Sequence, residues 1–182
     1  TGGIAKAEFN IPGVREIMGR SGRPLHIELK PPGYSTGAEI IIEATDGPQH
    51  YRADANIISK MMRVFVLNEN ESGERHPDLY PKRLVEASVP WFTNQGIPID
   101  SMLANFSSSY DGRPNLNYRQ YNEYLEGLGK DIITDADRYD AIRHTWEGRI
   151  MTDLGFTVPM FVIDVRAGTE GIISAKFEKS KD

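Results

Sequence analysis

The stretch Thr134–Phe156 constrains the fold most, because its start, interior and end all indicate one long helix. Thr134 and Asp137 have the spacing of a capping box, in which each side chain accepts a hydrogen bond from the other residue's backbone amide. Gly155 can adopt the left-handed backbone conformation that ends many helices, so it marks the C-terminus of the predicted helix. At about 100° per residue, one apolar face is expected to be buried: Ala136, Tyr139, Ile142, Trp146, Ile150 and Leu154.

Gly148 is the unusual residue of this predicted helix, since an interior glycine costs about 1 kcal/mol relative to alanine. Such a glycine indicates either a close backbone neighbour or a ligand. With Thr145 and Arg149 beside it, one hypothesis is that a phosphate or carboxylate approaches the helix backbone while the guanidinium holds it. The alternative is that a neighbouring strand packs against Gly148.

A second candidate site lies on the flank of the same helix, where Asp140, His144 and Glu147 are spaced at i, i+4 and i+7. This spacing places the three side chains on one side, so that a carboxylate orients the imidazole for general acid or base catalysis. The alternative interpretation is a solvated row of charges, in which Arg143 pairs with Glu147.

Composition excludes several classes of protein. The chain has 182 residues, which fits one domain, and residues 1–22 are expected to form an extended N-terminal segment. No apolar run is long enough for a membrane helix. A net charge of -5 and a pI near 5.4 argue against broad binding of nucleic acid. Cysteine is absent and the four histidines share no metal-ligand spacing, so no metal site is predicted.

The remaining pattern predicts strands followed by helices. Strands are expected at 25–29, 38–44, 64–67 and 97–106, and a hairpin at 157–165 and 171–177. Helices are expected from Pro81 to Gly96 and from Asn115 or Asn117 to Gly129, in addition to the helix at 134–156. This order predicts an α+β fold, with a mixed sheet of about five or six strands, three main helices and a C-terminal β-hairpin.

Two further candidates lie outside the long helix. The hydroxyl-rich segment Ser107–Asn117 leads from a strand to a helix, where ligands often bind, and its Tyr110 and Asn115 are candidate ligand-binding residues. An ordinary surface loop has the same composition. His26, on the outward face of a predicted strand, is another candidate ligand-binding residue. The alternative interpretation is that it is a structural histidine. No phosphate-binding glycine loop, GxSxG or HExxH motif is present, and the sequence leaves the cofactor, if any, unknown.

Three segments together resemble the C-terminal domains of Rhs/YD-repeat and related polymorphic toxin-type exported proteins. They are Gly22–Ile27, the segment 97–121, and Thr145-Trp146-Glu147-Gly148-Arg149 followed by Gly155-Phe156-Thr157. Glu147 stands where that family often has a second threonine. The resemblance implies secretion or delivery into a target cell, an upstream delivery domain, and an immunity protein as a partner. It implies no particular chemistry.

Two hypotheses of function follow. In the first, the chain is an effector enzyme acting on a nucleotide, an NAD-like molecule or RNA. His144 is then the general acid or base, Asp140 or Glu147 orients it, and Arg143 and Arg149 bind phosphate. In the second, the chain is a non-catalytic binding or assembly domain of a larger exported protein, and the helix at 134–156 is scaffold. The acidic charge disfavours a third hypothesis, an RNA-binding module.

Overall fold

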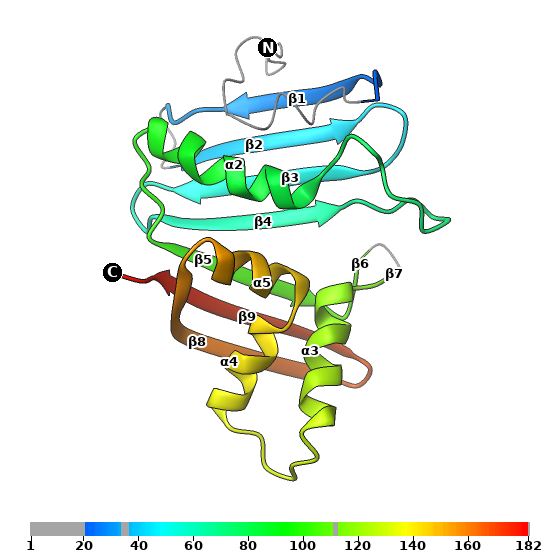
Figure 1. The fold of residues 1–182 in the computed structure, drawn as a ribbon, viewed down its shortest axis with the longest axis vertical. Coiled ribbons are helices and arrows are strands. Elements are labelled where there is room, and N and C mark those ends of the chain that lie inside the picture. Colours follow the sequence, from blue (N-terminus) through cyan, green and yellow to red (C-terminus); the bar gives the residue numbers. More distant parts are fainter. Residues whose placement is uncertain (1–20, 34–36, 111–112, 182) are drawn as a thin grey trace. The chain divides into compact units, whose positions relative to one another are not determined.

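The computed structural model describes residues 21–33, 37–110 and 113–181, so most of the extended N-terminal segment expected at 1–22 lies outside the described residues. The chain contains two compact units, Thr1–Ile99 and Asp100–Asp182. In the described residues, the N-terminal unit combines an antiparallel sheet with one helix and the C-terminal unit combines one with three helices, which confirms the α+β class predicted from the sequence (Figure 1). The single domain expected from the chain length stays a prediction.

In its described residues, the N-terminal unit is a meander of four strands in sequential order with one covering helix (Figure 1). Its elements are β1 (Leu25–Lys30), β2 (Gly37–Ala44), β3 (His50–Asn56), β4 (Met61–Leu67) and α2 (Pro81–Asn94). Leu25, Ile27 and Leu29 alternate with more exposed residues along β1, as the sequence pattern predicted. Helix α2 begins at a proline, which suits the first position of a helix, and it packs on β3 and β4.

Strand β3 was not predicted from the sequence. Its inward residues are Tyr51, Ala53 and Ala55, which are buried, while polar side chains alternate on the other face. Alanine has a low strand propensity, so the local pattern gives little signal. The small side chains pack beneath α2, where the Tyr51 hydroxyl lies 2.7 Å from Ser88 Oγ.

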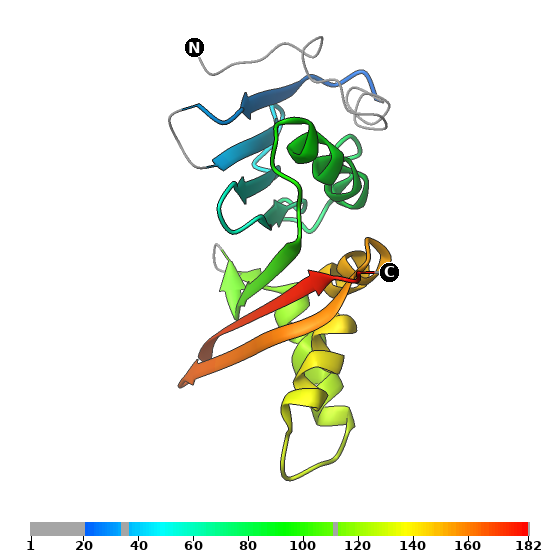
Figure 2. The same cartoon turned by 90° about the vertical axis from the view of Figure 1, so that its left-hand side faces the viewer.

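The described part of the C-terminal unit has a sheet in the order β5-β9-β8, a short two-stranded ribbon and three helices. Its elements are β5 (Ser101–Ser107), β6 (Ser109–Tyr110), β7 (Arg113–Pro114), α3 (Leu116–Gly127), α4 (Asp135–Arg143), α5 (Trp146–Asp153), β8 (Phe156–Ala167) and β9 (Glu170–Lys179). The three helices lie on one side of β8 and β9 (Figure 2). The predicted hairpin is confirmed, and both of its strands are longer than expected.

The single helix predicted at 134–156 is wrong, because the chain forms two helices, α4 and α5, separated at His144 and Thr145. Both predicted ends are correct. The capping box of Thr134 and Asp137 is present at the start of α4, and Gly155 has a φ of +90° after the last turn of α5. The described chain therefore has four helices, and none of them is long and apolar enough to cross a membrane.

Candidate functional site

The junction of α4 and α5 is organised by Thr145, which is fully buried. Its hydroxyl donates to the carbonyl of Ile142 at 2.6 Å and accepts from the Gly148 amide at 3.0 Å. Thr145 therefore closes α4 and caps α5, since side-chain oxygens at the N-cap satisfy the first free amides of a helix. These two hydrogen bonds of one hydroxyl group explain why the helix breaks at this point.

Gly148 is required at the junction by close packing. A β-carbon at this position would overlap the Ile142 carbonyl oxygen and lie 2.7 Å from the Ile142 carbonyl carbon. Packing is thus the explanation for the glycine, although the neighbour is the end of α4 and not the strand considered from the sequence. The remaining amides of the α5 N-terminus are satisfied by α3: Trp146 N–H donates to Gln120 Oε1 at 2.7 Å and Glu147 N–H to Asn117 Oδ1 at 2.9 Å.

Glu147 is the most perturbed acidic group of this region. The residue is 7% exposed, and its Oε1 is buried without a hydrogen-bond partner. Desolvation by burial raises its pKa from the usual 4.5 to about 8, because a dry environment disfavours the charged carboxylate. The position near the N-terminus of α5 acts in the opposite sense. Glu147 is therefore largely protonated at neutral pH and does not pair with Arg143.

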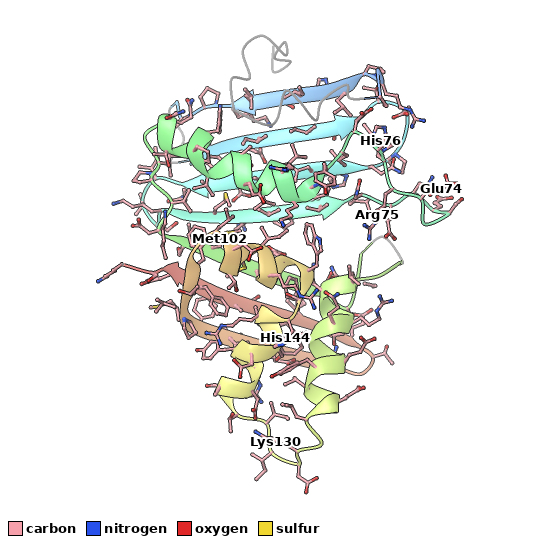
Figure 3. All side chains as sticks on the ribbon, in the orientation of Figure 1. Glu74, Arg75, His76, Met102, Lys130 and His144 are labelled. Atoms are coloured by element: carbon pink, nitrogen blue, oxygen red, sulfur yellow. The ribbon has the colours of Figure 1, made fainter. Side chains whose placement is uncertain are left out.

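His144 and Asp140 do not form the predicted carboxylate–imidazole pair. His144 lies at the end of α4 (Figure 3). Its Nδ1 lies 2.7 Å from the backbone carbonyl of Asp140, and its ring stacks on Tyr124 with centroids 4.3 Å apart. The Asp140 carboxylate instead accepts from Arg143 at 2.9 Å. Since the helix breaks after His144, the three residues Asp140, His144 and Glu147 do not share one helix face, and their catalytic roles stay predictions.

The other predicted binding residues are dispersed. Arg149 is exposed, and it has no side-chain hydrogen bond or ion pair among the described residues. Asn115 caps α3 by accepting from the Tyr118 amide at 3.1 Å, which confirms it as the cap. Tyr110 belongs to β6, and its side chain lies outside the described residues. His26 is exposed on β1 of the N-terminal unit.

A polar cluster in the N-terminal unit was missed by sequence reasoning. His76 is buried in the loop after β4 (Figure 3). Its Nδ1 accepts from the Asp78 amide at 3.2 Å, so Nε2 carries the proton and donates to Asp46 Oδ1 at 2.5 Å. The buried Asp78 carboxylate accepts from the Ser21 amide at 2.6 Å. Both imidazole nitrogens are occupied, so the cluster joins three loops and offers no free base. No group of three or more metal-ligating side chains occurs among the described residues.

A second missed feature is the outward face of the hairpin. Val158, Ile163 and Val165 of β8 and Ile172 of β9 are 42%, 52%, 60% and 53% exposed. The sequence pattern of β8 is apolar on both faces, which is typical of a strand covered on both sides. Here the helices cover only one side (Figure 2).

The covered side of β8 carries a charged pair fixed by α3. Arg166 donates to both oxygens of Asp164, at 2.8 and 2.9 Å, and to Asn122 Oδ1 at 2.6 Å. Tyr121 donates to Asp164 at 3.2 Å, and burial together with the Asp164 charge raises the Tyr121 pKa. The guanidinium lies over the Tyr118 ring, 5.4 Å from its centroid. Asp164 and Arg166 are therefore held in place at the sheet edge.

Comparison of the chain with protein-family models, with curated proteins and with solved structures finds no match.

Proposed function

We propose that the chain is a binding and assembly domain, in which the C-terminal unit binds a strand of another polypeptide along β8. The single observation that carries this proposal is the edge position of β8. Among the described residues β8 pairs with β9 alone, so the backbone groups on its other side have no strand partner. An exposed edge of this kind is the template that proteins use when they bind an extended peptide by strand addition.

The apolar side chains next to this edge support the proposal. Ile163 and Val165 point to the face opposite the helices, and Ile172 lies beside Val165 in the register of β8 and β9. In strand addition the backbone supplies affinity while alternate side chains supply contact area. A row of three half-exposed β-branched residues gives a partner strand such an area.

The two halves of β8 differ in how well they can take a partner. Irregularities in register occur between Phe156 and Val158 and between Pro159 and Phe161, whereas the pairing from Phe161 to Ala167 is continuous. Bulges and proline weaken an edge as a template for pairing. The proposed binding segment is therefore Phe161–Ala167.

The packing of α4 and α5 also favours this function over catalysis. Thr145 and Gly148 serve the helix junction, Asn115 serves a cap, and Arg143 binds Asp140. These four residues, which the sequence suggested as parts of a site, are thus engaged in holding the unit together. The upstream delivery domain and the exported context remain inferences from the resemblance.

Binding of a labelled peptide tests the proposed function. The probe is a blocked ten-residue peptide of alternating valine and threonine with a fluorescent label, and its anisotropy is measured against increasing concentrations of the chain. We expect the wild-type chain to raise the anisotropy. The same peptide with two central prolines is expected to give no rise, because proline lacks the amide that a strand needs.

The matched variants are Ile163→Lys and Ile132→Lys. Ile163 is 52% exposed on β8, and Ile132 is 80% exposed in the segment between α3 and α4. Ile163→Lys is expected to abolish the anisotropy change, since lysine on an edge strand opposes pairing, and Ile132→Lys is expected to leave it intact. Equal binding of both peptides, or equal binding by both variants, contradicts the proposal.

A second candidate function is the effector enzyme of the first hypothesis, and Glu147 favours it. A carboxyl group with a pKa of about 8 has the protonation state that a general acid needs near neutral pH. Expression of the chain inside bacteria tests this alternative. A toxic enzyme is expected to lose its toxicity in His144→Ala, Arg149→Ala and Glu147→Gln, and a harmless wild-type chain contradicts it.

A further inference from the structure

We propose that the strand bound at β8 is β8 of a second copy of this chain, paired antiparallel about a two-fold axis at Val165. This inference rests on the proposed function and names its partner. Closed two-fold dimers are the commonest oligomers of soluble proteins, and in them each residue i that contacts j is matched by j contacting i. The self-complementarity of Phe161–Ala167 therefore decides whether a second copy fits.

Charge selects the register. In an antiparallel pair, directly opposite residues point to the same face, so an axis at residue c brings position c+1 opposite c−1 of the other copy. Asp164 and Arg166 flank Val165 and share the helix-covered face of β8, since their β9 partners Ile173 and Gly171 are both buried there. An axis at Val165 thus places each Asp164 opposite the Arg166 of the other copy.

Neighbouring registers are unfavourable. An axis at Asp164 brings two carboxylates opposite each other, and an axis at Arg166 brings two guanidinium groups together. An axis at Ile163 places Asp164 opposite a valine. Like charges in directly opposite positions destabilise a sheet, and opposite charges stabilise it. Of the four axes considered, at residues 163, 164, 165 and 166, only the axis at Val165 places Asp164 opposite Arg166. The same pair opposes accidental pairing of this edge with unrelated strands.

The open face of the sheet is compatible with the register that charge selects. An axis at Val165 brings the two Val165 side chains into direct opposition and places Ile163 opposite Ala167 of the other copy. Ile172 lies beside Val165 on β9. The three most exposed apolar residues of this face, at 52%, 60% and 53%, thus form one cluster around the axis. Burial of such a cluster is the main favourable contribution to association.

Arg166 is positioned for this contact before association. Its guanidinium is fixed by Asp164, Asn122 and the Tyr118 ring, yet its side chain is 42% exposed. A preorganised side chain loses less conformational freedom when the partner binds. In the dimer, two Asp164 and two Arg166 form an alternating group of four charges across the axis.

Disulfide cross-linking tests the axis directly, because the chain has no cysteine. In Val165→Cys the two thiols lie opposite each other, with Cα atoms about 4.5–5.5 Å apart as in any antiparallel pair, which suits a disulfide. In Val158→Cys, an exposed position seven residues from the axis, the two thiols are about 46 Å apart at about 3.3 Å per residue. We expect Val165→Cys to form a covalent dimer under mild oxidation and Val158→Cys to form no covalent dimer.

Complementary charge variants provide a test that misfolding cannot imitate. Arg166→Asp alone and Asp164→Arg alone each place like charges across the axis, and each is expected to weaken the homodimer by about tenfold. A mixture of the two variants restores opposite charges at both positions. We therefore expect the mixture to form a heterodimer with near wild-type affinity, measured by sedimentation equilibrium with one variant carrying a fluorescent label.

The outcomes separate this inference from the proposed function. If Val165→Cys cross-links no faster than Val158→Cys, or if the mixture of charge variants forms no heterodimer, the two-fold pairing is overturned. If the valine–threonine peptide still binds wild type and not Ile163→Lys in that case, β8 takes a strand from another protein and the proposed function stands. Absence of both peptide binding and dimerisation overturns both proposals.

Discussion

The backbone carbonyl of Ile142 occupies the space that a β-carbon of Gly148 would need. Gly148→Ala is therefore expected to destabilise the chain, because backbone atoms of α4 and α5 must move apart. Overpacking of this kind costs about 1–3 kcal/mol. Urea unfolding followed by circular dichroism measures the loss.

The matched control for this variant is Gly127→Ala. Gly127 also lies in a helix, and an added β-carbon there would meet nothing within 4 Å. Alanine at this position is expected to stabilise the chain by about 0.5–1 kcal/mol, the difference in helix propensity. Equal losses in both variants would contradict the packing role of Gly148.

Glu147 makes the stability of the chain depend on pH in an unusual direction. The pKa of Glu147 in the folded state, about 8, exceeds the usual 4.5. Between pH 4.5 and pH 8 the folded state therefore binds more protons than the unfolded state. Stability is then highest at low pH within this window and falls as pH rises toward 8. Glu147→Gln removes this dependence, and its advantage over wild type at pH 9 is expected to be on the order of a few kcal/mol. Urea titrations at pH 5, 7 and 9 measure it, and a constant difference contradicts the prediction.

Asp46 is expected to act in the opposite sense. The hydrogen bond from His76 lowers the Asp46 pKa, so the stabilisation is present above the usual aspartate pKa and is lost as pH falls through the lowered value. Asp46→Asn should therefore lower the unfolding midpoint at neutral pH and converge with wild type in acid. Glu71→Gln, at an exposed position in the loop after β4, is the control that should show no change at either pH.

Tyr118 and Gly171 are expected to be energetically coupled. A β-carbon at Gly171 would collide with the Tyr118 hydroxyl and lie 3.3 Å from its ring carbons. Gly171→Ala should be destabilising, and less so in a Tyr118→Phe background, where the hydroxyl is gone. A double-mutant cycle of unfolding free energies measures the coupling, and strict additivity of the two changes contradicts the contact.

Local signals in the sequence were sufficient where one residue type decides the structure. The Thr134 capping box and the left-handed Gly155 were predicted and are confirmed, and of the two predicted caps Asn115 and Asn117 the structure has Asn115. The alternation of apolar and polar residues in β1 was also sufficient, because it is a local pattern of one strand. Each of these features depends on chemistry within a few residues of the chain.

Features that depend on distant partners were not predictable. The helix break at Thr145 has no proline or glycine at the break itself, and the freed amides of α5 are satisfied by Asn117 and Gln120 of α3. The Asp46–His76 bond joins residues 30 positions apart. Burial of Glu147 likewise could not be inferred from helical spacing, because that spacing assumed one continuous helix.

The order of strand pairing has a consequence for folding during synthesis. In the N-terminal unit each strand pairs with the next one along the chain, from β1 to β4. In the C-terminal unit β5 pairs with β9, so that Ser101 lies opposite Glu178. Because contacts between nearby residues form sooner than those that close long loops, the meander can pair while the ribosome is still translating. Strand β5 has to wait until β9 emerges, and β8 gains its neighbour at the same moment.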